Sequence, residues 1–185
     1  MKRIVILLSL LFALGLNARP MSTYMPKTNI VMVDTLATAA EIRNYSLNEL
    51  HITIGTKMSD ADVMFMSAQC DKHNIPIEYV IRLIRKESNF NPNAVNPNDG
   101  SSGYMQLHPP TYQSLKKIYL GQGNTLTGLS KGQENLTLGT FYIKRLWNKY
   151  SDWKKVFMAY NGGPGAVNNN SVGPAKYARS ILGLI

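Results

Sequence analysis

The hydrophobic positions of this sequence recur mostly at the spacing of α-helices. The clearest stretch runs from Asn135 to Tyr150, where apolar side chains keep to one helical face over about four turns. We predict a core helix there. Clusters of Gly, Pro, Ser, Asn and Asp separate it from other stretches with helical character. The further predicted helices cover residues 59–73, 75–87, 111–120, 152–160 and 174–184.

The start of the chain has the pattern of a secretory signal peptide. A positively charged beginning precedes an apolar run over residues 4–16, and Ala18 offers a small residue for cleavage. The run is shorter than the roughly 20 residues that span a bilayer, and no cysteine lies beside it to carry a lipid. We therefore expect residues 1–18 to be removed and the protein to be exported, to a bacterial periplasm or beyond, without a stable membrane anchor.

The remainder divides into a weakly patterned part and a strongly patterned one. Residues 19–58 form an N-terminal extension whose structure the pattern leaves open, apart from an alternation over 51–54 that is typical of a short strand. Residues 59–185 carry the strong helical patterns. A chain of this length has enough apolar residues for one hydrophobic core. We expect a single compact, mainly helical domain over 59–185.

The composition adds a positive charge, which favours anionic partners. The formal net charge is +9, from 20 basic and 11 acidic residues. No predicted helix interleaves Lys and Arg with aromatic residues as nucleic-acid-binding helices do, so we expect no nucleic-acid partner. The charge of an exported basic protein is better matched to an acidic cell wall or membrane surface.

Neither a disulfide nor a metal site is expected. Cys70 is the single cysteine, and the pattern places it as a small buried residue in a helix. His51, His73 and His108 lack the spacing of metal ligands. Residues 93–100 have the Asn and Asp content of a calcium loop but not its alternating acidic ligands or its closing Glu, so a turn is predicted. We expect no metal and no cofactor.

Glu87 is the strongest candidate for chemistry. It follows Val80, Leu83 and Ile84 on the same helical face, at a position where the pattern predicts an apolar side chain. A turn-rich segment comes directly after it and would leave the carboxyl group at the mouth of a cleft. A carboxyl group partly removed from water can keep its proton near neutral pH. The position therefore predicts a general acid.

Four short segments, in this order, resemble the successive signatures of the soluble lytic transglycosylase catalytic domain. They are ESNFNPNAV, GSSGYMQL, NLTLGTFYI and AYNGGPG, and the similarity spans roughly residues 60–181. The resemblance implies an all-α domain of the lysozyme-like α+β superfamily, with a goose-lysozyme-like fold and a saccharide cleft. It also implies cleavage of the β-1,4 bond between N-acetylmuramic acid and N-acetylglucosamine in peptidoglycan, which leaves a 1,6-anhydro end without the use of water.

The same resemblance assigns the site residues. It makes Glu87 the sole catalytic acid and base and Tyr160 its partner, which would orient the carboxyl group and help set its proton affinity. Asn96 stands where the family often has a serine near the reacting sugar, and an amide can also donate and accept hydrogen bonds. Polar groups of the sugar would meet Asn96 and other amides, and its rings would meet apolar side chains. The expected substrate-binding residues are Ser88, Asn96, Tyr104, Met105, Gln106, Tyr142 and Asn161.

A second catalytic carboxylate is hard to find in the sequence. Glycoside cleavage usually employs two carboxylates, but Asp99 lies in a predicted turn, and Glu134 and Asp152 lie near predicted helix starts. A single acid points to substrate assistance, in which the C6 hydroxyl group of the sugar attacks.

Two alternatives stay open: a lysozyme that hydrolyses the same bond with water, and a non-catalytic peptidoglycan-binding module. The expected partners are peptidoglycan glycan strands and a secretion or pilus assembly complex, and the protein is expected to be a monomer.

Overall fold

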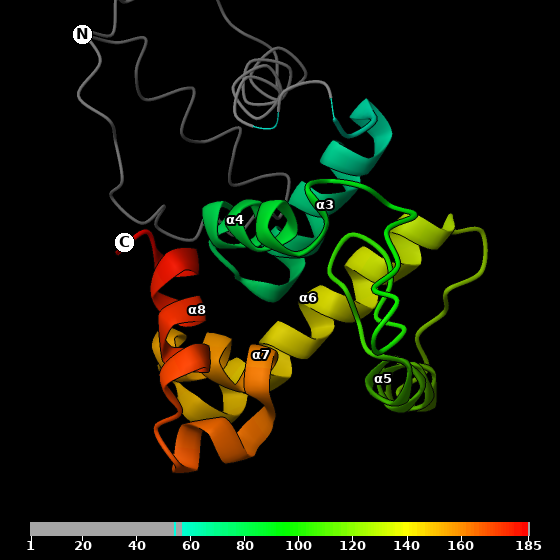
Figure 1. Ribbon diagram of the computed structural model, residues 1–185. Coiled ribbons are helices and arrows are strands. Elements are labelled where there is room, and N and C mark those ends of the chain that lie inside the picture. The colour runs from blue at the N-terminus through cyan, green and yellow to red at the C-terminus, as the bar shows by residue number, and fades with distance from the viewer. Residues whose placement is uncertain (1–53, 55–56, 185) are drawn as a thin grey trace, which may run out of the picture. The chain divides into compact units, whose positions relative to one another are not determined.

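The computed structural model describes residue 54 and residues 57–184, which belong to one compact unit. The helices of this part are α3 (Asp60–His73), α4 (Ile77–Ser88), α5 (Pro109–Gly121), α6 (Lys131–Tyr150), α7 (Trp153–Asn168) and α8 (Val172–Leu182) (Figure 1). Only isolated β-bridges, Val95 with Ser102 and Ser102 with Leu107, occur among these residues. The mainly helical prediction is confirmed for the described residues.

The predictions for the first 53 residues lie outside the described part of the chain. These are the signal peptide over 1–18, nearly all of the extension over 19–58, and most of the strand over 51–54. Ile54, the last residue of that predicted strand, is helical and buried. None of the described helices has the length and apolar character needed to cross a bilayer.

Local signals set the ends of α3 and α4. The Ser59 hydroxyl accepts from the Asp62 N–H at 3.2 Å, as an N-cap residue does. Asn74 and Asn89 end the two helices in the left-handed conformation, at φ 55° and φ 50°. Asn tolerates this conformation better than most residues because its short side chain can hydrogen-bond locally. The two helices therefore begin and end within a few residues of the predicted positions.

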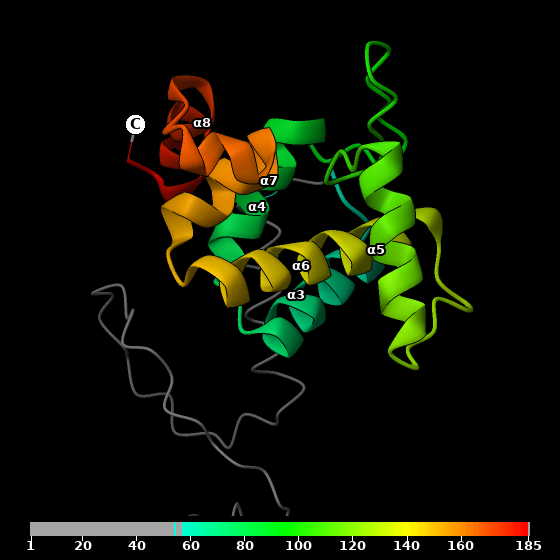
Figure 2. The same ribbon diagram turned by 90° about the horizontal axis from the view of Figure 1, so that it is seen from below.

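Helix α6 runs through the middle of the described residues. Helix α3 lies along it, α5 packs near one end, and α7 packs near the other (Figures 1 and 2). It begins at Lys131, four residues before the predicted Asn135, because Ser130 and Gln133 form a capping box that starts it earlier. The apolar stripe that predicted this helix is the face that fills the core.

Helix α7 is longer than the sequence predicts. The sequence predicts that it ends near Tyr160, but the helix continues to Asn168 across a kink at Gly163, with φ 73° and ψ 176°. Only glycine adopts this backbone conformation readily. Pro164 follows, and because it lacks an N–H it suits the first turn of the renewed helix. Helix α8, which packs closely on α7, begins two residues before the predicted Pro174.

The buried apolar side chains form two clusters. The larger one is built from α3, α4, α6, α7 and α8 together with Tyr104 and Met105 of a loop. The smaller cluster joins α5 to one end of α6 and consists of Leu107, Leu115, Tyr119, Leu138 and Phe141. Because α5 is attached through its own cluster, the loop between α4 and α5 is held at both ends, and the candidate site lies along this loop.

Candidate active site

Glu87 lies in the last turn of α4, where its side chain is half-buried. Its Oε1 atom accepts a hydrogen bond from the hydroxyl group of Tyr177 on α8. Burial raises the pKa of Glu87 above its ordinary value, and nearby Asp99 adds a small increase. The hydrogen bond from Tyr177 and the charge of Lys86 act in the opposite direction. The net rise means that this carboxyl group keeps its proton to a higher pH than an exposed one.

The loop over residues 89–108 forms one wall beside Glu87. The hydroxyl group of Ser88 donates to the Tyr104 carbonyl at 2.8 Å, and the Gly103 N–H donates to the Ala94 carbonyl at 2.9 Å. The Asn135 side chain accepts from the Met105 N–H at 2.8 Å and donates to the Ser102 carbonyl at 2.9 Å. These bonds satisfy buried backbone groups that water cannot reach. The loop is thereby fixed to both α4 and α6.

The segment NLTLGTFYI has a structural explanation on α6. Asn135, Gly139 and Tyr142 share one helical face, since they are four and three residues apart. Asn135 holds the loop, and Gly139 makes room for Met105, because a Cβ atom at Gly139 would lie 2.2 Å from the Met105 sulfur. Tyr142 continues this face into the cleft. The segment therefore builds the wall of the site from the helix outward.

Tyr160 does not hydrogen-bond Glu87, contrary to the sequence-based expectation. Its hydroxyl group donates to the Met105 carbonyl at 2.7 Å, and its ring lies against Tyr142 with 5.3 Å between ring centroids. Burial, and then the neighbouring charge of Glu87, raise the pKa of Tyr160. Tyr160 thus stands close to the acid and supports the loop, while Tyr177 is the hydrogen-bond partner of Glu87.

Sequence reasoning missed Tyr177. It lies on the apolar face of α8 with Ala178 and Ile181, and all three are buried. A buried tyrosine needs a partner for its hydroxyl group, and this requirement is the signal that could have pointed to it. Burial, followed by the charge of Glu87, raises the pKa of Tyr177, so the phenol stays protonated and donates.

An open cleft of about 850 Å³ lies in front of Glu87. This volume is within the usual range of about 300–1,000 Å³ for small-molecule sites. Most residues predicted for the site meet here: Glu87, Ser88, Asn96, Gln106, Tyr142, Tyr160 and Asn161 all line it. The cleft is also bordered by Arg85, Lys86, Asp99 and His108.

Tyr104 and Met105 are corrections to the prediction. Both were expected to offer apolar faces to sugar rings, but their side chains are 1% and 0% exposed. The Met105 side chain fills the space beside Gly139, and the Tyr104 hydroxyl group donates to Asp62 at 2.8 Å. Their contribution to the site comes from the backbone, since their carbonyl groups accept the hydrogen bonds of Tyr160 and Ser88.

Two of the three amide side chains in the cleft already make hydrogen bonds within the loop. Gln106 donates through Nε2 to the carbonyl groups of Ala94 and Gly103, at 3.1 and 3.0 Å. The Asn96 Oδ1 accepts from the Asn98 N–H at 3.0 Å. A ligand in the cleft would therefore meet the carbonyl end of Gln106 and the NH₂ end of Asn96.

Asp99 is a turn residue, as predicted, and it also borders the cleft. Its carboxyl group accepts from the Ser101 N–H at 2.9 Å, and this bond lowers the pKa of Asp99. Its side chain is exposed. The cleft thus holds two carboxyl groups with opposite pKa shifts, a raised one on Glu87 and a lowered one on Asp99. Within the described part of the chain, no group of three or more His, Cys, Asp and Glu side chains is arranged to hold a metal ion.

The chain belongs to the transglycosylase SLT domain family. The model of this family matches residues 64–181, more than half of the chain. The matched region contains Glu87, Tyr160 and Tyr177, together with the loop and α6 face that surround them.

Known relatives agree with this assignment. The soluble lytic murein transglycosylase of Escherichia coli (strain K12) is 33% identical over 105 residues, which cover 54% of this chain and 16% of that protein. The crystal structure of the 70 kDa soluble lytic transglycosylase from Escherichia coli matches with a TM-score of 0.55 and 23% identity, over 65% of this chain and 22% of that one.

A further solved structure, an inactive mutant of the lytic transglycosylase Slt from Pseudomonas aeruginosa, matches with a TM-score of 0.59 and 19% identity. The match covers 78% of this chain and 26% of that one. At these identities the structural likeness concerns the fold. The chain spans less than a third of the length of each of these relatives.

Proposed function

We propose that this protein is a peptidoglycan lytic transglycosylase. It would cleave the β-1,4 bond between N-acetylmuramic acid and N-acetylglucosamine and leave a 1,6-anhydro end, with Glu87 as the single acid and base. The observation that carries this proposal is a half-buried carboxyl group with a raised pKa, hydrogen-bonded by Tyr177 at the edge of an open cleft. Family membership and a relative named for murein transglycosylase activity support it.

Glu87 would act twice in this reaction. Protonated, it gives its proton to the bridging oxygen as the C1–O bond breaks and positive charge develops at C1, which the N-acetyl carbonyl of the substrate can stabilise. Ionised, it takes the proton of the C6 hydroxyl group, whose oxygen forms the new bond to C1. The proton count closes, because Glu87 ends the cycle protonated and no water is consumed.

The surroundings of Glu87 suit both steps. Burial favours the protonated form that begins the reaction, whereas the hydrogen bond from Tyr177 favours the ionised form that follows bond cleavage. A phenol with a raised pKa serves this purpose, since it donates without losing its own proton. The two effects oppose each other and keep both protonation states of Glu87 accessible.

The cleft walls supply candidate contacts for the sugars. Tyr142, which lines the cleft, offers an aromatic face, and Asn96, Gln106 and Asn161 offer amide groups for hydroxyl and acetamido groups. Ser88 lines the same space, but its hydroxyl hydrogen goes to the loop. We assign sugar binding to the three amides and Tyr142, and loop support to Ser88 and Tyr160.

Hydrolysis of the same bond is the second candidate. Asp99 favours it, because a hydrolase needs a second group to direct water, and Asp99 is a carboxylate bordering the same cleft. Ser101 holds this carboxylate in a turn, which accounts for Asp99 without a catalytic role. The products distinguish the two reactions, since only a transglycosylase leaves anhydro ends.

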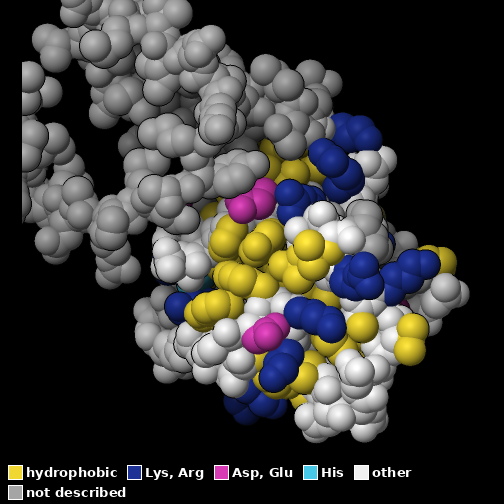
Figure 3. Space-filling model, turned by 90° about the vertical axis from the view of Figure 1, so that its left-hand side faces the viewer, with side chains coloured by type: hydrophobic (Ala, Val, Ile, Leu, Met, Phe, Trp, Pro, Cys, Tyr) yellow, Lys and Arg dark blue, Asp and Glu magenta, His cyan; other side chains and the backbone are white. Residues whose placement is uncertain are grey.

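The charge of the protein suits an anionic polymer such as the cell wall. Lys and Arg side chains spread over the face shown in Figure 3, where acidic side chains are few. Helices α4 and α8 contribute Arg82, Arg85, Lys86, Lys176 and Arg179 to the basic residues of the chain. Three predictions from the sequence stay predictions: export, a monomeric state, and a role in a secretion or pilus assembly complex. A deletion strain with normal surface assembly would count against the role in such a complex.

Mass spectrometry of digested peptidoglycan tests the proposed function. Purified peptidoglycan is incubated with the protein and, in parallel, with Glu87→Gln. We expect anhydro-muropeptides from the wild type and none from the variant. Reducing ends in place of anhydro ends would identify a lysozyme. Binding to peptidoglycan without cleavage by either protein would identify a non-catalytic binding module.

A further inference from the structure

Helix α8 carries Tyr177, so the placement of this helix decides whether the hydrogen bond to Glu87 forms. The helix packs closely on α7 and also meets α4 (Figure 1). A hydrogen bond between two oxygen atoms spans about 2.5–3.0 Å, and a displacement of about 1 Å weakens it severely. The bond at Tyr177 alone leaves α8 free to slide along α4 and to turn, whereas a second point of attachment restricts both movements.

Arg82 of α4 makes this second contact. Its Nη1 atom donates to the Ile181 carbonyl group of α8 at 3.1 Å, and the Arg82 side chain is half-buried. Ile181 lies one helical turn after Tyr177, and Arg82 lies five residues before Glu87. The two contacts are therefore about 6 Å apart along α8 and about 7.5 Å apart along α4. Contacts at this separation fix both the position and the rotation of α8 against α4.

The C-terminal cap of α8 leaves the Ile181 carbonyl group for Arg82. An α-helix ends with four carbonyl groups that have no partner inside the helix. Gly183 ends α8 at φ 73°, and its N–H donates to the carbonyl groups of Arg179 and Ser180. The carbonyl group of Ile181 is the next one along the chain, and the Arg82 guanidinium group takes it. A cation at this place also suits the negative end of the helix dipole.

Gly183 leaves the room that the guanidinium group needs. A Cβ atom at Gly183 would lie 3.1 Å from the Arg82 Nη1 atom and 3.2 Å from its Cζ atom. The guanidinium group therefore lies against bare backbone, in a place from which a side chain would push it. The end of α8 thus fits Arg82 in two ways, with an open carbonyl group and with a residue that has no side chain.

The charge of Arg82 is not what influences Glu87. The described side chains whose charges or hydrogen bonds are coupled to Glu87 are Lys86 of α4, Asp99 of the loop, Tyr160 of α7 and Tyr177 of α8. Arg82 does not belong to this set. Its connection with the acid runs through the position of α8.

We propose that Arg82 is a positioning residue for the acid: by holding the last turn of α8 on α4, it keeps the Tyr177 hydroxyl group on the Glu87 carboxyl group. The effect on catalysis rests on the proposed function, whereas the effect on the carboxyl group does not. Without the contact, α8 stays attached to α7 but its last turn moves against α4, and the phenol meets the carboxyl group for only part of the time. Since the phenol favours the ionised form of Glu87, the acid then becomes harder to ionise.

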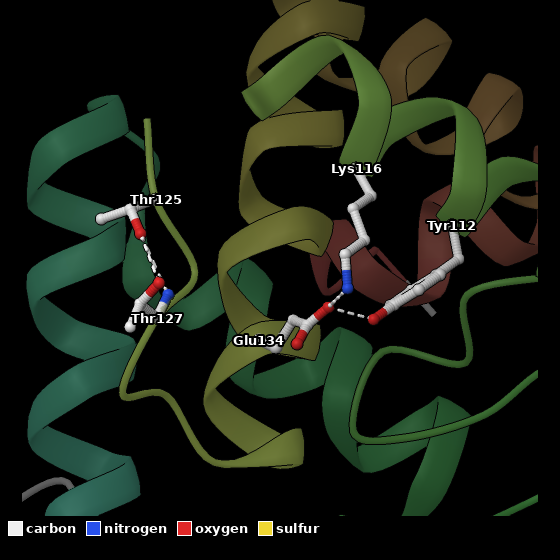
Figure 4. A network of polar contacts seen from close by, with 5 residues as sticks. All are labelled: Tyr112, Lys116, Thr125, Thr127 and Glu134. Atoms are coloured by element: carbon white, nitrogen blue, oxygen red, sulfur yellow. Dashed lines mark hydrogen bonds and ion pairs between the residues drawn. The ribbon is translucent and has the colours of Figure 1, made fainter. Parts of the chain in front are cut away.

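A general loss of stability is the rival explanation, and another polar contact between helices provides its control. Lys116 of α5 donates to Glu134 of α6 at 2.8 Å, and Tyr112 of α5 donates to the same oxygen atom (Figure 4). The substitution Lys116→Met weakens this contact without altering α4 or α8. Only the loosening of α8 should change the proton affinity of Glu87.

The test measures the pKa of Glu87 by NMR of the full chain with ¹³C-labelled glutamate carboxyl groups, and the signal absent from Glu87→Gln identifies it. We expect Arg82→Met, which keeps an apolar chain and removes every donor, to raise this pKa. Arg82→Lys, which restores a donor and the charge, should return the pKa most of the way. Lys116→Met should leave it unchanged, and so should Arg179→Met, which removes an exposed cation from the same end of α8.

A double variant tests whether Arg82 acts through Tyr177. Tyr177→Phe removes the hydrogen bond itself, so adding Arg82→Met should raise the pKa of Glu87 no further. Additive shifts would overturn the proposal, because Arg82 would then reach Glu87 by another route. So would an unchanged pKa in a folded Arg82→Met, with folding checked by circular dichroism. If Arg82→Met does not fold, Gly183→Ala gives the same test, since its Cβ displaces the guanidinium group: an upward shift supports the proposal and an unchanged pKa overturns it.

Activity separates this proposal from the proposed function. We expect Arg82→Met to lower kcat for the release of anhydro ends about tenfold, since a misplacement of about 1 Å can cost about 100-fold. The alkaline limb of kcat/KM should move to higher pH, and KM should stay nearly the same because the residues assigned to sugar binding lie outside α8. A raised pKa of Glu87 in Arg82→Met, in a protein that cleaves no glycan, would refute the proposed function and leave the role of Arg82 intact. Release of anhydro ends by the wild type, with the pKa unmoved in Arg82→Met, would refute the role of Arg82 alone.

Discussion

Tyr177 and Glu87 lie 90 residues apart in the sequence, and the Tyr177 hydroxyl group donates its hydrogen bond to the Glu87 carboxyl group. The bond joins α8 to the end of α4; Tyr177 is buried and Glu87 is half-buried. Burial and this hydrogen bond act on the proton affinity of Glu87 in opposite directions.

Replacing Tyr177 by Phe should shift the pH dependence of activity upward. The hydrogen bond favours the ionised form of Glu87, so its loss raises the pKa of Glu87 further. The acid must be protonated at the start of the reaction, and the alkaline limb of kcat/KM therefore moves to higher pH. We also expect kcat to fall about 10- to 100-fold, since a bond worth about 1.5–3 kcal/mol is lost from the ionised form.

A matched control for this variant is Tyr150→Phe. The Tyr150 hydroxyl group is buried without a hydrogen-bond partner among the described residues, so its removal should leave the pH profile unchanged. An unshifted alkaline limb in Tyr177→Phe would contradict the role given to that phenol.

Replacing Lys86 by Met should shift the same limb in the same direction, by less. The Lys86 ammonium group lies 5.7 Å from the centroid of the Tyr177 ring, and its charge lowers the pKa of Glu87. Lys86 is exposed, and an exposed charge acting on a neighbour is worth about 0–1 kcal/mol, so the change in rate should stay within about tenfold. Lys149→Met, which removes a cation from the Tyr150 ring, should have no effect on the profile. A downward shift in Lys86→Met would contradict this account.

The Glu87→Gln variant should be more stable than the wild type at neutral pH. The folded-state pKa of Glu87 is raised by burial, so its contribution to stability is fully present below the ordinary pKa and is lost as the pH rises through the folded-state value. A neutral Gln has no such loss. Thermal unfolding from pH 4 to pH 8 should show the two proteins diverging as the pH rises, with the variant above. Parallel curves would mean that Glu87 ionises in the folded protein as easily as in the unfolded chain.

Replacing Gly139 by Ala should destabilise the protein and reduce its activity. The new Cβ would lie 2.2 Å from the Met105 sulfur, and Met105 is wholly buried. We expect a loss of about 1–3 kcal/mol, as for other overpacked cores, measured by urea unfolding. Gly121→Ala is the control, because a Cβ there has nothing within 4 Å, and at this last residue of α5 the change should leave the stability nearly unchanged. Equal stability of the two variants would show that Met105 moves aside at little cost.

Cys70 should resist thiol reagents in the folded protein. Burial raises the pKa of its thiol to about 12, so the reactive thiolate is scarce, and the side chain is 1% exposed. A colorimetric disulfide reagent should react with it only as the protein unfolds in urea. Rapid reaction under native conditions would show that α3 opens readily.

The sequence predicts the helices well where apolar spacing and capping residues agree. The stripe on α6 and the Ser59 cap of α3 are local features, and the structure contains both. It predicts less where a glycine has two possible uses. Gly162 and Gly163 favour a helix end after Tyr160, but the chain resumes the helix after Gly163, whose φ is positive, and the added turns pack against α8.

The residues of the site, like the helices, were predicted only in part. Glu87 stood out because an acid occupied an apolar position, and it does lie beside the cleft. Tyr104 and Met105 were misplaced because neighbouring residues in an irregular loop can face the core or the cleft with no periodic signal. Tyr177 was missed because its contact with Glu87 depends on how a distant helix packs, which no local pattern records.

The placement of Tyr177 has a consequence for biosynthesis. A chain still emerging from the ribosome, with Glu87 in α4, lacks this phenol until about half of α8 has been made, and lacks the hydrogen bond until α8 has docked. A fragment that ends before Tyr177 would carry Glu87 without the hydrogen bond that stabilises its ionised form. Under the proposed function, the pair of Glu87 and Tyr177 is therefore complete only after α8 has docked on the rest of the domain.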